Sequence, residues 1–150
     1  MKVKIKRLTP TAHLPAYQSD GAAGADLYAD LDAPLTIQPG ETALIPTGLA
    51  LECPSSEQAE PNVVILLFAR SGLAVKRGLG LANGVGVVDP DYRGEVKVAL
   101  HHHGTEPYTV LPGERVAQMA FLPLLRTEFE EADSLSDTER GAGGFGHTGV

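Results

Sequence analysis

Cysteine, tryptophan and long apolar stretches are rare or missing in this 150-residue sequence. Cys53 is the single cysteine, so no disulfide can form within the chain, and a reducing, cytoplasmic compartment is the expected location. The N-terminus alternates lysine with apolar residues and lacks the continuous apolar core of a signal peptide. The longest apolar runs, such as residues 63–69, are much too short to cross a bilayer. We therefore expect no membrane partner.

Basic residues are also in the minority. Twelve lysines and arginines stand against 19 aspartates and glutamates, which gives a formal net charge of −7. A surface of this sign repels nucleic acid, so no nucleic-acid partner is expected. A polyphosphate ligand would need a local cluster of positive charge to offset the overall field.

Helical periodicity is the third feature that the sequence lacks, because no amphipathic run with a 3.6-residue period extends beyond a turn or two. Aromatic residues make up only 5% of the chain, so the core must be built mostly from Val, Leu, Ile and Ala. Seventeen glycines and eleven prolines punctuate the sequence, and turn signals recur about every ten residues. This spacing predicts one all-β domain, a sandwich or a barrel.

The turn signals divide the chain into short apolar segments. We expect strands at 2–8, 25–31, 35–37, 42–45, 49–51, 63–68, 85–88, 95–100, 108–111 and 115–125, the last broken by Pro123. Residues 71–78 have room for one short helix. We expect residues 1–136 to form the β-domain, and the glycine-rich residues 137–150 to form a flexible C-terminal arm.

The segment GVGVVDPDYRG, residues 84–94, contains the clearest candidate for catalysis. An apolar strand ends at Asp89, and Pro90 restricts the backbone directly after it. A carboxylate on such a rigid strand end is well placed to act as a general base toward a water molecule. The pattern alone also fits an Asx turn, in which Asp89 only accepts backbone hydrogen bonds and Tyr92 packs under the turn.

A second candidate site lies in FARSGLA, residues 68–74. Arg70 offers a forked set of donors, Ser71 a hydroxyl and Gly72 an unobstructed backbone N–H, and this combination suits a phosphate. A surface turn with a solvated arginine is the alternative. Gln118 interrupts an apolar run and needs a polar partner, either within the core or on a ligand.

Two further patterns are set aside. GLGLANG, residues 78–84, does not open a helix after a strand, so it is not a dinucleotide fingerprint. The histidines at 101–103 cannot converge on one metal ion, because successive side chains of a strand point to opposite faces. We expect them to form a solvated strand end.

Five segments together resemble the motifs of the trimeric dUTPase family, and they occur in the family's order. They are AGADLYA (23–29), ARSGLA (69–74), NGVGVVDPDYRGE (83–95), GERVAQMAF (113–121) and RGAGGFGHTG (140–149). The resemblance covers nearly the whole chain. It implies a small, jelly-roll-like β-barrel subunit in a homotrimer with active sites shared between subunits. It also implies hydrolysis of dUTP to dUMP and pyrophosphate with Mg²⁺ as cofactor.

The resemblance implies roles for the residues that match the first and third motifs. Asp89 is the expected base for the water that attacks the α-phosphorus. Tyr92 is expected to pack where a ribonucleotide's 2′-hydroxyl would clash, and Asn83 and the backbone at Gly86 to read uracil from a narrow hairpin. Asp26 resembles the carboxylate that lies near the water shell of the metal.

The remaining motifs imply contacts with the phosphates and closure of the site. By resemblance, Phe145 covers the uracil ring, and the arm of one subunit closes the site of a neighbour. The residues expected to bind the phosphate chain or to line the closed site are Arg70, Ser71, Gly72, Gln118, Arg140, Gly146, His147 and Thr148.

Two other readings compete with this one. A dCTP deaminase is similar in fold, but as we align it Ala99 stands where that group carries a catalytic glutamate, and Gly72 stands where it has a second serine. That group also lacks the Gly-Phe-Gly arm. A β-sandwich module used only for binding would leave Asp89, Tyr92 and Arg140 without a purpose.

Overall fold

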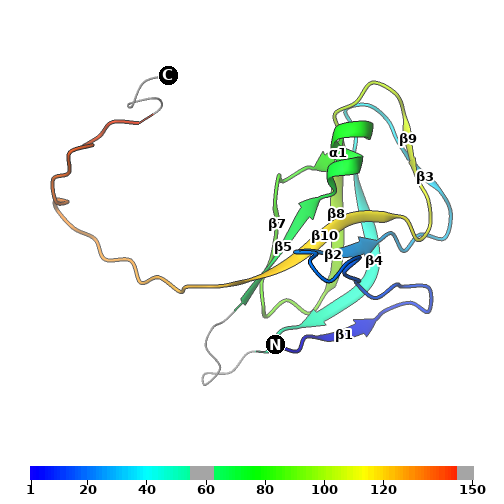
Figure 1. Ribbon diagram of the computed structural model, residues 1–150, viewed down its shortest axis with the longest axis horizontal. Helices are drawn as coiled ribbons and strands as arrows, with labels where there is room; N and C mark the ends of the chain where they lie inside the picture. The colour runs from blue at the N-terminus through cyan, green and yellow to red at the C-terminus, as the bar shows by residue number, and fades with distance from the viewer. Residues whose placement is uncertain (55–62, 145–150) are drawn as a thin grey trace.

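Two four-stranded antiparallel sheets and one two-stranded ribbon form the body of the protein (Figure 1). The computed structural model describes residues 1–54 and 63–144. One sheet has the order β1 (Lys4–Arg7), β4 (Thr42–Glu52), β8 (Glu95–His102), β6 (Leu79–Leu81). The other has the order β2 (Ala25–Tyr28), β10 (Arg115–Pro123), β5 (Val63–Ala69), β7 (Gly86–Val88), and the ribbon pairs β3 (Leu35–Ile37) with β9 (Tyr108–Val110). The all-β prediction is confirmed.

The core consists of aliphatic side chains from the inner faces of these sheets. In β8, Val96, Val98 and Leu100 are at most 2% exposed while the residues between them face outward, as the period-two pattern predicts. Cys53 lies in the same core, and burial raises the pKa of its thiol. Other large buried side chains are Leu27, Ile37, Ile45, Leu49, Ile65, Leu79, Val110 and Met119.

Strand β4 differs from the prediction. The sequence predicts two strands separated by a turn at residues 46–48, but one strand of 11 residues runs through this segment. Its register with β8 shifts between Pro46 and Ala50, which marks a bulge, and Gly48 has a φ of 64°. The Gly48 N–H donates to Glu95 Oε1 at 2.9 Å, so the bulge is hydrogen-bonded to the neighbouring strand and the sheet continues past the proline.

The short helix predicted after β5 is present as α1 (Ser71–Arg77) and ends at Gly78, which has a φ of 67°. Strand β6, which follows it, was not predicted, because its three residues, preceded by Gly78 and interrupted by Gly80, give too short a pattern. The turn between β6 and β7 also differs from the expected hairpin: β6 pairs with β8 and β7 pairs with β5. This turn therefore connects the two four-stranded sheets.

His101 and His102 end β8 and His103 follows it; the ring centroids of His101 and His103 lie 4.4 Å apart, while His102 points the other way, into the core. His102 is 1% exposed, however, so the prediction of a solvated strand end is wrong for this residue. Its Nδ1 accepts the Gly104 N–H at 3.1 Å and its Nε2 lies 2.6 Å from the Glu106 carbonyl oxygen. These partners fit a neutral imidazole that donates from Nε2.

The chain leaves the body after β10, which ends at Pro123. Residues 124–144 contain neither helix nor strand, are almost all exposed, and lead away from the sheets in Figure 1. Phe129 and Leu135 are 93% and 89% exposed on this segment. Within the described ranges, no helix has the length and apolarity needed to span a membrane.

Candidate functional site

Asp89 lies on a tight turn at the end of β7. The Tyr92 N–H donates to the Asp89 carbonyl oxygen at 3.1 Å, and Arg93 Nη1 donates to the Pro90 carbonyl oxygen at 2.8 Å. These bonds use the backbone of the turn, and the Asp89 side chain is exposed. The described residues give its carboxylate no hydrogen-bond partner, so an Asx turn does not account for it.

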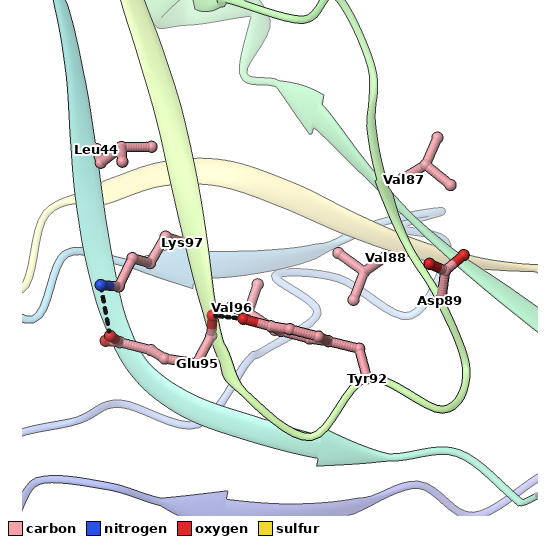
Figure 2. A pocket seen from close by; sticks show the side chains of 8 residues that line it. All are labelled: Leu44, Val87, Val88, Asp89, Tyr92, Glu95, Val96 and Lys97. Atoms are coloured by element: carbon pink, nitrogen blue, oxygen red, sulfur yellow. Dashed lines mark hydrogen bonds and ion pairs between the residues drawn. The ribbon is translucent and has the colours of Figure 1, made fainter.

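Asp89 and Tyr92 line one pocket of about 320 Å³ (Figure 2). Figure 2 shows the Tyr92 ring extending from the turn toward Glu95, where its Oη donates to the backbone carbonyl oxygen at 3.2 Å. Val87 and Leu44 add apolar walls and are 64% and 65% exposed. The pocket therefore combines a free carboxylate, an aromatic ring and exposed apolar surface.

Two charged residues of this pocket were not predicted. Lys97 Nζ lies 3.4 Å from Glu95 Oε2, and both side chains line the pocket wall on β8. Their places on the strand follow from the period-two pattern, but no sequence motif points to the pocket.

A second cluster surrounds Asp26, whose side chain is 1% exposed. Arg115 Nη1 donates to Asp26 Oδ2 at 3.0 Å, and Gln118 Nε2 donates to Oδ1 at 3.1 Å. Arg70 Nε lies 3.4 Å from Oδ1 as a charge contact without hydrogen-bond geometry. The polar partner that Gln118 requires is thus Asp26, and Arg115 is the member of this cluster that the sequence prediction missed.

Arg70 lies between this cluster and the exposed start of α1. Its Nη1 donates to the Arg115 carbonyl oxygen at 3.0 Å, and its side chain is 25% exposed. Ser71 and Gly72 follow at the start of α1 and are exposed. An added Cβ at Gly72 would meet no heavy atom within 4 Å, so the space beside this backbone is open. The predicted phosphate ligands Arg70, Ser71, Gly72 and Gln118 are therefore neighbours.

The two clusters lie at opposite ends of β5. Val88 is opposite Ile65 and Gly86 is opposite Leu67 in the β5–β7 pair, so the same register extended by one residue places Asp89 opposite Val64, near the start of β5. Arg70 follows the other end of the same strand. At about 3.3 Å per residue, roughly 15–20 Å of strand separates the two positions. Within the described residues of one chain, Asp89 and the cluster around Arg70 therefore do not meet.

Sequence comparisons give the chain's relatives. The family model described as dUTPase matches residues 10–149. The chain is 55% identical to the deoxyuridine 5′-triphosphate nucleotidohydrolase of Desulfitobacterium hafniense, over 100% of this chain and 97% of that protein. The protein of the same name from Hahella chejuensis is 48% identical over 100% of this chain and 95% of that protein. The chain belongs to the dUTPase family. The predicted resemblance is confirmed.

Solved dUTPase structures share the fold. The Staphylococcus bacteriophage 80alpha dUTPase with dUpNHpp superimposes with a TM-score of 0.87 at 24% identity, covering 99% of each chain. A mutant of the dUTPase from phage phi11 of S. aureus, described as coordinating a structural Mg(II) ion, has a TM-score of 0.79 at 19% identity. It covers 91% of this chain and 100% of that one.

The other residues predicted from the dUTPase motifs lie as follows. Asn83 is exposed on the turn between β6 and β7, where its carbonyl oxygen accepts the Val85 N–H at 2.8 Å. Gly86 is buried, and a Cβ there would lie 2.9 Å from Leu67 Cβ, so close packing on β5 requires glycine. Arg140 is exposed, and its Nε donates to the Gly143 carbonyl oxygen at 2.9 Å. Phe145, Gly146, His147 and Thr148 lie outside the described residues.

Asp26 does not offer a direct metal ligand. Both of its carboxylate oxygens accept hydrogen bonds from protein donors, and its side chain is buried. In the part of the chain that the structure describes, no three His, Cys, Asp or Glu side chains form a group that could hold a metal ion.

Proposed function

We propose that this dUTPase hydrolyses dUTP to dUMP and pyrophosphate in a homotrimer whose active sites are shared between subunits. Membership of the dUTPase family supports the reaction. The observation that carries the shared site is the separation of Asp89 from Arg70 along β5, because the base and the phosphate ligands must meet around one nucleotide. A second chain that places its Arg70, Ser71 and Gly72 beside the Asp89 pocket would bring the base and the phosphate ligands together.

In this proposal Asp89 is the general base. Its exposed carboxylate stands on a turn that is fixed by Pro90 and by the Tyr92 N–H, so its position is defined before substrate binds. It takes a proton from a water molecule as that water attacks the α-phosphorus in line with the leaving pyrophosphate. Asn83 and the backbone at Gly86 contact the uracil, and Tyr92 packs against the deoxyribose.

Positive charge from a neighbouring chain holds the triphosphate. Arg70, Ser71, Gly72 and Gln118 donate to phosphate oxygens, and the buried Asp26 positions the Arg70 and Gln118 side chains through its own contacts. Arg140, His147 and Thr148 of the C-terminal arm complete the phosphate site, and Phe145 with Gly146 covers the base. The exposed course of residues 124–144 away from the body supports an arm that reaches another subunit.

Mg²⁺ bound together with dUTP would supply positive charge that offsets the charge of the phosphates. Mg²⁺ in proteins usually keeps several of its waters, so few protein carboxylates would be needed to hold it. The engagement of both Asp26 oxygens by Arg115 and Gln118 fits a contact through water and not direct coordination. The chain's own residues orient the nucleotide and hold the proton at Asp89. We place the enzyme in the cytoplasm, because the buried Cys53 thiol suits a reducing compartment.

A substrate panel tests this function. With Mg²⁺ present, dUTP is expected to yield pyrophosphate, while dCTP, dTTP and UTP yield at least about 100-fold less, because each lacks a group that the site reads or adds one that clashes. Pyrophosphate and ammonia are measured separately. Ammonia release from dCTP would identify a deaminase, and no product from any nucleotide would favour a binding module.

A further inference from the structure

The backbone conformation at Gly94 does not require glycine, but the position of the Tyr92 side chain does. The φ of Gly94 is not in the left-handed region, so an L-amino acid fits the backbone there. A Cβ on Gly94 would nevertheless lie 2.5 Å from Cζ and 3.0 Å from Cε2 of Tyr92, and closer still to Oη. The tip of the Tyr92 ring therefore occupies the space in which residue 94 would carry a side chain.

Two hydrogen bonds keep the tyrosine in this place. Its backbone N–H donates to the Asp89 carbonyl oxygen at 3.1 Å, and its Oη donates to the Glu95 carbonyl oxygen at 3.2 Å. The ring is 48% exposed and forms one side of the pocket that Asp89 lines (Figure 2). The tip of the ring lies against Gly94.

We infer that Gly94 is the positioning residue that sets where the Tyr92 ring stands in the pocket, and thereby the discrimination against ribonucleotides. This inference rests on the proposed function, in which Tyr92 packs against the deoxyribose. An ordinary carbon–carbon contact is about 3.5–4.0 Å long, so an alanine at 94 must displace the ring tip by roughly 1 Å and break its bond to Glu95. Because the displaced atoms are the end of one exposed side chain, the fold can absorb the change.

The test compares Gly94→Ala with the parental enzyme and with Gly21→Ala. Gly21 is an exposed loop glycine where an added Cβ would meet nothing within 4 Å, so this variant is the matched control. Binding of the non-hydrolysable α,β-imido analogues of dUTP and UTP is measured by calorimetry, and kcat/KM is measured for dUTP and UTP. A misplacement of about 1 Å can cost up to about 100-fold, so we expect Gly94→Ala to lower the dUTP-over-UTP ratio at least about tenfold. Gly21→Ala is expected to keep the parental dUTP-over-UTP ratio. Both variants are expected to keep the parental thermal midpoint.

A double-mutant cycle with Tyr92→Ala separates positioning from a general effect on structure. If Gly94 acts through the ring, Gly94→Ala changes the ratio less than about twofold once Tyr92 is already alanine. A tenfold loss in both backgrounds, or an unchanged ratio in Gly94→Ala alone, would overturn the inference. The binding measurements also distinguish failure of this inference from failure of the proposed function. If the parental enzyme discriminates between the two analogues but hydrolyses neither nucleotide, only the proposed function is contradicted.

Discussion

Replacing Asp89 by asparagine is expected to leave nucleotide binding almost unchanged and to lower kcat by about 100-fold or more. Asparagine has the same shape as aspartate but cannot accept the proton of the attacking water. The turn does not depend on the carboxylate, because its hydrogen bonds come from the backbone at Asp89 and from Arg93. Binding is measured with α,β-imido-dUTP and turnover with dUTP, so that the two effects are observed separately.

The matched control is Asp91→Asn. Asp91 lies two residues away on the same turn and is also exposed, and its replacement by asparagine removes the same formal charge. It is expected to keep kcat within about twofold, since surface substitutions away from a site have small effects. Turnover of Asp89→Asn at the parental rate would show that another group takes the proton.

Deleting residues 139–150 is expected to leave a folded trimer with kcat/KM for dUTP reduced by about 100-fold or more. The deletion removes Arg140 and Phe145, and a charge-assisted phosphate contact together with a base-stacking contact is worth about 3–5 kcal/mol. Among residues 1–54 and 63–144, every buried apolar residue precedes Pro123, so the core packing seen in the structure does not involve residues 139–144. The thermal midpoint is therefore expected to stay within a few degrees.

Removal of Val150 alone serves as the control for shortening the chain, and it retains every arm residue assigned a role. Light scattering reports the assembly of each variant. A truncated chain that no longer assembles would show that the arm is structural, and one with parental kcat/KM would show that the arm does not close the site.

The sequence predicts most of the fold because the strands are half buried. The alternation of Val96, Val98 and Leu100 with outward residues is a local pattern, and it is visible without knowledge of the neighbours. The continuity of β4 was not predictable, because Pro46 and Gly48 are local turn signals. A partner distant in the sequence decides the outcome: Glu95 on β8 accepts the Gly48 N–H and keeps the bulge within the sheet.

The sequence likewise predicts some residues of the candidate site and misses others. Asp89 and Arg70 stand where strands end, and the motifs indicate them directly. The ion pair between Asp26 and Arg115 depends on the register of β2 against β10, which joins residues 89 positions apart. Gly94 was missed for a different reason: its constraint arises from the Tyr92 side chain, which folds back over the next residues. The separation of Asp89 from Arg70 likewise follows only from the pairing of β5 with β7.

Subunit mixing tests the shared site most directly. Asp89→Asn and Arg70→Ala chains with different tags are co-expressed, and trimers that contain both are isolated by two affinity steps. Each variant alone is checked for folding by its thermal midpoint and is expected to be nearly inactive. In a cyclic trimer whose sites take Asp89 from one chain and Arg70 from the next, about one site in three receives both native residues in either mixed composition. The account predicts about a third of the parental turnover in the mixed trimers, and turnover no higher than that of the two inactive parents would contradict it.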